Sequence, residues 1–321
     1  MEAISDMKKL LLFACAILAF LSVSCNQDLK DSDTIELIVN TGDIDTKTAV
    51  VLESDQYKST WKAGDKIYLM EMTHFYSSSY SDATDLMEYS SSPLTADTKT
   101  ASFPITLIAK GKDPGDKYRY IMYYPVDPYV DGSAYSAPPE YDLGKGHLTY
   151  RLGIVTTQKP TADSFDPNAD LLVSELVESD TQPSLIAAKF ARVGSIARVV
   201  LKGLPAGATV MSGTMSFPEL WSPYCFEIDP VANSAGLSTL IKGAKEINFQ
   251  PQGVTVDSNG EAVIWLRTAS GTLDNWFAFR VLVNNGSDAY YSKTVDLHAL
   301  SKTLVFDQGK LTKFSVTLAA E

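Results

Sequence analysis

The chain has 321 residues, 45% of them hydrophobic, with a formal net charge of −12 and a sequence pI near 4.7. This length suits one large domain or two of ordinary size, and the apolar fraction is sufficient for a real core. The acidic balance and the lack of a dense Lys/Arg cluster argue against a nucleic-acid-binding protein.

The first 25 residues have the organisation of a secretory signal. Two lysines precede an apolar run over residues 10–21, and small residues follow it. The run is shorter than the roughly 20 residues that a membrane-spanning helix needs. Because a cysteine follows the small residues directly, we predict a lipoprotein signal over residues 1–25 with lipid on Cys25. The alternative is a plain secretory signal. Residues 26–34 are polar and acidic and predict a flexible tether.

Short segments of period two, bounded by Gly, Pro, Asp, Asn and Ser, follow in the first half of the chain. Pro104 indicates a sheet edge or a bulge for its segment. Residues 77–92 and 127–146 are expected as long loops. The strands expected here are residues 35–39, 48–52, 67–72, 101–108, 118–124, 148–155 and 171–173.

The second half continues the same pattern, with almost no segment of helical period. We therefore predict an all-β protein built of β-sandwiches. The soft segment 178–183 predicts a boundary between an N-terminal domain, residues 35–182, and a C-terminal domain, residues 183–321. A single large β-domain is the alternative. The strands expected here are residues 186–190, 196–201, 210–217, 246–249, 262–266, 276–283, 290–295 and 312–318.

Residue types that mark catalytic or metal sites are sparse. His74, His147 and His298 lie far apart without a zinc-ligand spacing, and we expect them at the surface or in loops. The segment 166–170 alternates oxygen ligands as in the first half of a calcium loop, but the later Gly and Glu are missing. Cys225 is expected as a small buried apolar residue. We expect no cofactor, no metal site and no catalysis.

Several pieces of sequence, taken in order, resemble the Bacteroidales fimbrillin family, which comprises subunits, anchors and tip proteins of fimbria-like filaments. The resemblance covers nearly the whole chain after the signal. It implies two tandem transthyretin-like β-sandwich domains in an outer-membrane lipoprotein exposed at the cell surface. The matching pieces are Cys25 and residues 46–48, 61–67, 101–103, 120–125, 164–173, 189–192 and 306–316.

In the filament-forming members of that family, a protease removes the lipidated first strand, and a strand of a neighbouring subunit fills the groove. This is β-augmentation, in which an unpaired edge gains ladder hydrogen bonds and side-chain pockets. The processing enzyme of the best-studied members cuts after Arg, but the first Arg of this chain is Arg119, and Lys47 is the nearest substitute. The segments expected to carry strand exchange contain Ile35, Leu37, Val39, Phe314, Val316 and Leu318.

The expected function is a structural and adhesive component of such a filament, as a bulk subunit, an uncleaved anchor or a tip subunit. Its expected partners are other fimbrial subunits, the outer membrane through the lipid, and a surface receptor. The alternative is a monomeric surface glycan-binding lipoprotein with a patch of loop aromatics as its site. We expect the tyrosines considered for that patch to pack within their own strand and loop rather than to form it. They are Tyr123, Tyr124, Tyr129, Tyr135 and Tyr141.

Overall fold

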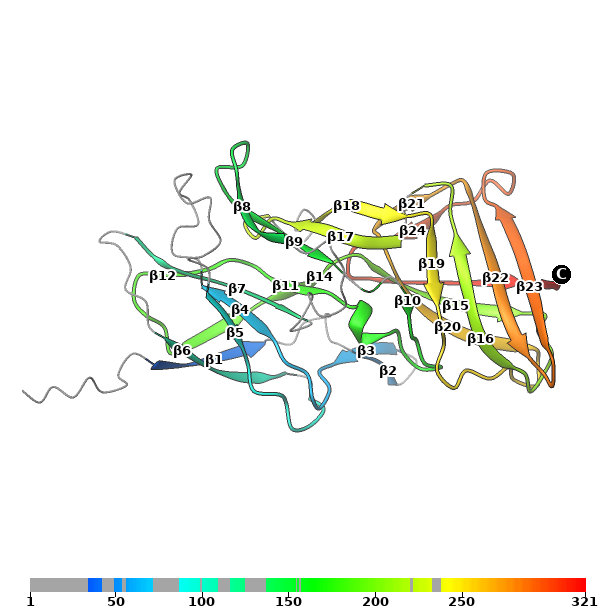
Figure 1. Cartoon of the computed structure of the whole chain (residues 1–321), viewed down its shortest axis with the longest axis horizontal. Helices are drawn as coiled ribbons and strands as arrows, with labels where there is room; N and C mark the ends of the chain where they lie inside the picture. The colour runs from blue at the N-terminus through cyan, green and yellow to red at the C-terminus, as the bar shows by residue number, and fades with distance from the viewer. Residues whose placement is uncertain are drawn as a thin grey trace, which may run out of the picture. The chain divides into compact units, whose positions relative to one another are not determined.

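The computed structural model is built almost entirely of β-strands, so the prediction of an all-β fold is confirmed (Figure 1). Residues 36–106 and 112–321 form one compact unit, which contains all or most of every strand. Within the described ranges, no helix is long and apolar enough to cross a membrane. The structure describes residues 34–41, 49–53, 56–71, 87–98, 100–108, 116–124, 137–153, 155, 157–219, 222–232 and 238–321.

Two sheets are formed mainly by strands of the first half of the chain. The smaller has the order β13-β1-β6, and the larger has the order β14-β11-β7-β4-β5, with β12 also paired to β7. The bounds in the smaller sheet are β1 (Thr34–Thr41), β6 (Ser102–Ile108) and β13 (Leu185–Ala188). Those in the larger sheet are β4 (Tyr68–Glu71), β5 (Met87–Ser90), β7 (Tyr118–Tyr124), β11 (Leu172–Ser174), β12 (Val177–Ser179) and β14 (Phe190–Arg192).

Strand β7 is buried on both faces after its first residue. Ile121 and Tyr123 of β7 contribute to a core cluster with Phe226 and Ile228. The alternate residue Tyr124 has its ring 6.0 Å from that of Trp61. The larger sheet is therefore covered by apolar side chains on both sides.

Three smaller groups of strands are also present. A four-stranded sheet has the order β18-β17-β9-β8, and two antiparallel pairs are formed by β2 with β3 and by β21 with β24. The bounds are β2 (Ala49–Glu53), β3 (Gln56–Thr60), β8 (Ala137–Asp142), β9 (His147–Gly153), β17 (Ser222–Ile228), β18 (Ser238–Ala244), β21 (Gly271–Leu273) and β24 (Leu304–Phe306).

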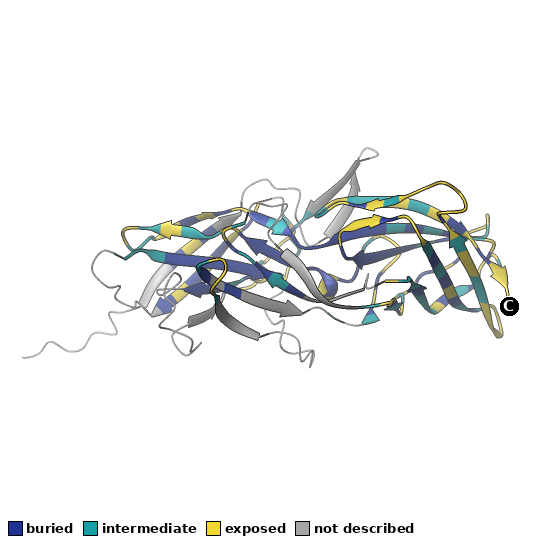
Figure 2. Ribbon diagram, turned by 90° about the horizontal axis from the view of Figure 1, so that it is seen from above, coloured by how far each residue is buried: buried dark blue, intermediate teal, exposed yellow. Residues whose placement is uncertain are grey.

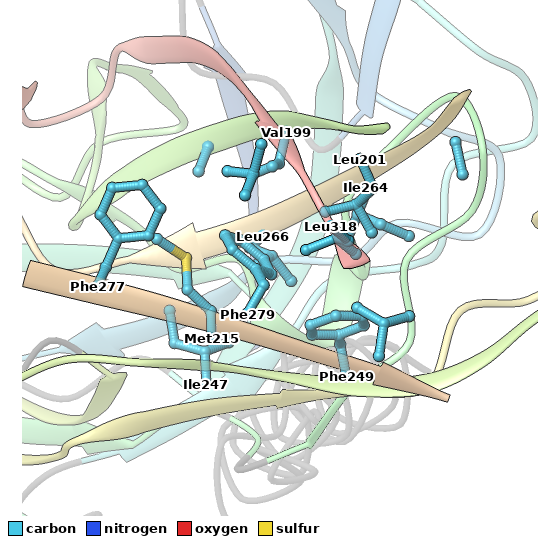
Figure 3. Close-up of a cluster of buried hydrophobic side chains, with 14 of the residues drawn as sticks. Val199, Leu201, Met215, Ile247, Phe249, Ile264, Leu266, Phe277, Phe279 and Leu318 are labelled. Atoms are coloured by element: carbon cyan, nitrogen blue, oxygen red, sulfur yellow. The ribbon is translucent and has the colours of Figure 1, made fainter. Parts of the chain in front are cut away.

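The C-terminal strands form a two-layer sandwich. A sheet of order β10-β19-β16-β22-β23-β26 faces a sheet of order β20-β15-β25. Figure 3 shows the side chains of both layers meeting, Val199, Leu201 and Ile264 from one and Phe277 and Phe279 from the other. The bounds are β10 (Thr157–Gln158), β15 (Ser195–Lys202), β16 (Thr209–Ser216), β19 (Glu246–Phe249), β20 (Glu261–Thr268), β22 (Trp276–Asn284), β23 (Asp288–Asp296), β25 (Leu311–Thr317) and β26 (Ala319–Ala320).

Burial alternates along the strands of this sandwich, as Figure 2 shows by the change of colour from residue to residue. Along β22, every second residue from Phe277 to Val283 is buried, and Arg280 between them is exposed. This is the period of two expected when one face of a sheet packs on a core. The alternation of apolar and polar residues that predicted these strands therefore matches the alternation of buried and exposed side chains in the sandwich.

The structure differs from the sequence-based expectation at a few positions. Strand β5 lies within the expected loop 77–92, and β8 lies within the expected loop 127–146. The latter strand contains two adjacent prolines, and its pairing with β9 shifts register between Ala137 and Glu140, which accommodates residues that cannot donate to a ladder. Strand β6, which contains Pro104, is an outer strand of its sheet, as expected.

One histidine also differs from expectation. His147 is largely buried rather than at the surface, and its Nε2 lies 2.9 Å from Oδ1 of Asp229.

The division into two domains at residue 182 stays a prediction. Strands from beyond it, β13 and β14, pair with β1 and β11 before it.

Candidate strand-exchange site

Strand β1 lies inside its sheet, between β13 and β6. Leu37 and Val39 are completely buried, whereas Ile38 between them is 44% exposed. Successive side chains of a strand point to opposite faces, so β1 presents one apolar row to the interior. Burying a Leu or Val side chain fully is worth about 1.5–3 kcal/mol each. This row therefore anchors β1 in addition to its ladder hydrogen bonds.

The partner of β1 on one side is a strand far away in sequence. Ile38–Thr41 pair in parallel with Leu185–Ala188, and the backbone N–H of Ile38 donates to the carbonyl of Ser184 at 3.0 Å. In this register Val39 is opposite Ile186, and both are buried. Ile38 is opposite Leu185, and both are exposed. The pair of strands thus has one buried and one solvent-facing apolar row.

An aromatic cluster centred on Trp61 packs beside this sheet. Phe103 of β6 has its ring centroid 5.1 Å from that of Trp61, in an edge-to-face arrangement. Phe190 of β14 is 5.8 Å from the same ring. Trp61 is followed by a tight turn, in which Gly64 has φ +94 and the Asp65 carboxylate accepts from the backbone N–H of Lys62 at 2.6 Å. Only glycine adopts that backbone conformation readily, which explains the Trp-Lys-Ala-Gly-Asp order.

The second predicted exchange segment occupies a different position. Strand β25 pairs in parallel with β15, with Phe314 opposite Val199 and Val316 opposite Leu201. Val316 and Leu318 are 3% and 4% exposed and belong to the sandwich core. The ring of Phe314 lies 5.6 Å from that of Phe277. These side chains are therefore part of the core of the C-terminal sandwich.

Residues after β25 are also paired. The backbone N–H of Leu318 donates to the carbonyl of Lys202, and β26 pairs with Tyr291 and Ser292 of β23. The Glu321 carboxylate accepts hydrogen bonds from the guanidinium of Arg280, with Nη2 and Oε2 3.0 Å apart. The chain from Leu311 to Glu321 thus bridges from one sheet of the sandwich to the other.

A buried ionic cluster connects β14 with β20. The Asp170 carboxylate, 0% exposed, pairs with Arg192 at 2.8 Å and with Arg267 at 3.2 Å. Arg267 also donates to the backbone carbonyls of Ser195 and Val193. Desolvation by burial lowers the pKa of Arg267 to about 9, which leaves its guanidinium charged at neutral pH. The calcium-loop-like segment 166–170 therefore has its last carboxylate held by two arginines.

The first carboxylate of that segment is held as well. Asp166 accepts from the backbone N–H groups of Lys159 and Asn168, and the second of these bonds caps the short 3-10 helix η2 (Pro167–Ala169). An Asp at this position satisfies a donor that the helix start leaves open. Both carboxylates have structural partners within the chain.

Several predicted site residues cannot be placed. Cys25 and Lys47 lie outside the described residues, as do Tyr129 and Tyr135. Ile35 is in β1, but its side chain is outside the described part. Lys47 falls between the end of β1 and the start of β2. Strand exchange through these residues stays a prediction.

The tyrosines proposed as an exposed patch are placed in part. Tyr123 and Tyr124 are 0% and 6% exposed within β7, so these two offer no platform to a ligand. Tyr141 lies in β8, and its side chain is not among those described.

No pattern in the sequence predicted that β13 would be the partner of β1. Asp170 and Arg192 both lie in matching pieces of the family resemblance, but neither piece indicated that the two residues pair.

No protein-family model matches the chain, and no curated protein matches it. Among solved structures, it is similar to a candidate cell adhesion protein of Bacteroides uniformis, with 16% identity, 91% of this chain and 97% of that chain covered, and a TM-score of 0.46. A candidate cell adhesion protein of Bacteroides ovatus gives 12% identity, 89% and 94% coverage, and a TM-score of 0.47. A fimbrial assembly protein of Parabacteroides distasonis gives 8% identity, 88% and 90% coverage, and a TM-score of 0.40. At these identities and TM-scores, we base no functional conclusion on the similarity.

Proposed function

We propose that this protein is a structural and adhesive subunit of a fimbria-like surface filament, in which subunits are joined by exchange of β1. The observation that carries the proposal is the place of β1, a strand inserted between β13 and β6 with Leu37 and Val39 completely buried. The sequence resemblance to the fimbrillin family supports the same role.

Removing β1 would leave a slot rather than a single edge. The strands on its two sides, β13 and β6, would each present unpaired N–H and C=O groups, and the apolar positions under Leu37 and Val39 would be open. An extended strand of a neighbouring subunit would regain both ladders and fill the apolar positions, which is β-augmentation. A strand that fills this slot would therefore need an apolar side chain at every second position.

Cleavage between β1 and β2 would make that exchange feasible. Lys47 lies in this connection, which runs from Thr41 to Ala49. A cut there separates β1 covalently from the rest of the fold. Without a cut, β1 stays attached, and the protein acts as an anchor held to the outer membrane by lipid on Cys25. In either case the proposed partners are other fimbrial subunits and a surface receptor, and no catalysis is involved.

A reversible lock on β1 tests the proposal. Ile38 and Leu185 are opposite each other, both exposed, and on one face of the sheet. Neighbouring strands lie about 4.8 Å apart, within the Cα separation of about 4.4–6.8 Å that a disulfide spans. The double variant I38C/L185C should therefore close a disulfide that holds β1 in its own subunit.

The readout is the form extracted from the native cell surface without boiling. We expect the wild type to give a heat-sensitive ladder on a denaturing gel, with a new N-terminus after Lys47. The oxidised double variant should give monomer only, whereas I38C alone and L185C alone should retain the ladder. A ladder that persists in the oxidised double variant would contradict exchange of β1. A wild-type monomer that keeps its lipid would contradict the bulk-subunit role.

A further inference from the structure

The outward face of the six-stranded sheet has a shallow depression of about 330 Å³, which we call the sheet-face groove. It crosses the neighbouring strands β10, β19, β16, β22 and β23, which lie side by side in Figure 1. This volume is at the lower end of the range for small-ligand sites, about 300–1,000 Å³. The groove therefore suits a small ligand or a short part of a larger one.

Register places polar side chains across the groove in rows. Thr157 is opposite Asn248, Asn248 is opposite Thr214, and Thr214 is opposite Arg280. Residues that are opposite each other in neighbouring strands share one face of the sheet. Ser212 is opposite Leu282 in the adjacent row. The strands thus align side chains from four different segments of the chain.

A β-bulge in β16 determines which side chains of this strand face the groove. The pairing of β16 with β22 shifts register between Val210 and Ser212, which makes Met211 the extra residue. Val210 before the bulge and Met215 after it are both buried. Without the extra residue, the alternation would turn Ser212 toward the core. The bulge therefore places Ser212 on the solvent side, and such bulges commonly re-aim side chains next to functional sites.

The neutral polar side chains of the groove have unused hydrogen-bonding capacity. Within the described part of the chain, no hydrogen bond joins these side chains to another side chain or to the backbone. Hydroxyl and amide groups of this kind offer donors and acceptors together, which a polyhydroxylated ligand can use in pairs. These side chains are Thr157, Ser212, Thr214, Asn248 and Gln250.

An exposed aromatic ring lies at the groove in a fixed arrangement, whereas the other aromatic lining residue, Phe249, is buried. Tyr290 is 41% exposed, and the guanidinium of Arg280 lies over its ring, with Cζ 3.7 Å from the centroid. This cation–π contact orients the ring before any ligand binds. Arg280 is in turn paired with Glu321 at 3.0 Å, so its charge is compensated. Tyr290 can supply a rigid apolar surface at little cost in conformational entropy.

We propose that the sheet-face groove binds a neutral saccharide, one or two sugar units of a glycan chain. Hydroxyl groups of the sugar would pair with the Asn248 and Gln250 amides and the Thr and Ser hydroxyls, and a pyranose ring would stack near Tyr290. Arg280, the one charged lining residue, is paired with Glu321, and the protein carries a formal charge of −12. Both facts disfavour an anionic ligand. This inference does not depend on exchange of β1, because β1 and its neighbours β13 and β6 form a different sheet from the one that carries the groove.

The test uses the secreted form of the full chain after the signal, with saturation-transfer NMR and titration calorimetry. The probes are maltotriose, cellotriose, xylotriose, galactotriose, mannotriose and N-acetylchitotriose, with trigalacturonate as the anionic comparison. We expect at least one neutral trisaccharide to bind. Asn248→Ala and Tyr290→Ala should each weaken that binding about tenfold, the effect of one lost hydrogen bond or stacking contact.

Thr294→Ala is the matched control. Thr294 is an exposed residue of β23 that is opposite Ala278 and does not line the groove. It should bind as the wild type does. Chemical-shift mapping on the unmodified chain, independent of any variant, should place the perturbed amides on β16, β19 and β22. The inference is overturned if none of the neutral trisaccharides binds, if trigalacturonate binds best, or if Asn248→Ala and Thr294→Ala behave alike.

Discussion

Strands β1 and β25 are both paired in parallel with a strand distant in sequence, yet they are held in different ways. β1 lies between two strands and contributes the buried pair Leu37 and Val39. β25 is an outer strand of its sheet, and it contributes Phe314 and Val316 to the core of the sandwich. The residues after it continue into β26 of the opposite sheet.

The difference indicates which strand can be exchanged. Removing β1 leaves two facing edges that another strand can satisfy together. Removing β25 leaves one edge and opens the core, because the ring of Phe314 lies between 5.6 and 6.4 Å from three other phenylalanine rings, those of Phe277, Phe279 and Phe306. We therefore assign the proposed exchange to β1 and a structural role to β25.

A charge placed in each strand gives the largest contrast. Val316→Asp puts an unpaired carboxylate into the sandwich core, and we expect a loss above about 4 kcal/mol, enough to prevent folding. Val39→Asp should instead expel β1 and leave the C-terminal sandwich folded. Near-UV circular dichroism and thermal melting measure both. If Val39→Asp also abolishes the cooperative transition of the sandwich, β1 is integral to the fold and the assignment is wrong.

The buried ionic cluster should be the next most sensitive feature. Asp170→Ala leaves the guanidinium groups of Arg192 and Arg267 without their carboxylate, and removing one partner of a buried pair costs about 3–5 kcal/mol. Asp180→Ala, at an exposed position, is the control and should change stability by less than about 0.5 kcal/mol. Urea unfolding of both variants gives the comparison. Equal midpoints for the two variants would show that the cluster adds nothing to stability.

Truncations within β1 should separate its two faces. Leu37→Ala removes a fully buried side chain and should weaken the attachment of β1 by about 2–5 kcal/mol. Ile38→Ala removes a half-exposed neighbour and should cost much less. Hydrogen exchange of the β1 amides reports the local opening, while the β15 amides serve as the internal reference. Faster exchange of β15 in Leu37→Ala would mean that β1 cannot open by itself.

The smallest effect concerns the ion pair after β26. The hydrogen bond from Arg280 lowers the pKa of Glu321, so the contribution of this carboxylate is present above its unfolded pKa of about 4.3. It is lost as the pH falls through the lower pKa of the folded state. Because both side chains are exposed, Glu321→Gln should lower the urea midpoint only slightly at pH 7 and by still less at pH 3. A large decrease at pH 7 that disappears at pH 3 would mean that this ion pair, rather than the core, holds β25.

The sequence predicted the strands better than their partners. Alternation identified β1, β15, β22 and β25 because each has one face on a core. It could not identify the pairing of Val39 with Ile186, since no local pattern encodes the register of strands so far apart. The sheet-face groove was likewise not predictable from the sequence, because it depends on the bulge at Met211 and on side chains from five separate segments. Asp170 and Arg192 were unexpected inside, since charged residues are seldom buried unless they are paired.

The most direct measurement is strand replacement in the intact fold. The chain after the signal would carry a specific protease site in place of residues 44–47, and a fluorescent peptide of residues 34–41 would be added before and after cleavage. We predict that the uncut protein takes up no peptide, and that the cut protein exchanges its own β1 for it. A peptide with Val39→Asp should not be taken up. Exchange of β1 is contradicted if the cut protein takes up no peptide, or if the uncut protein takes it up equally well.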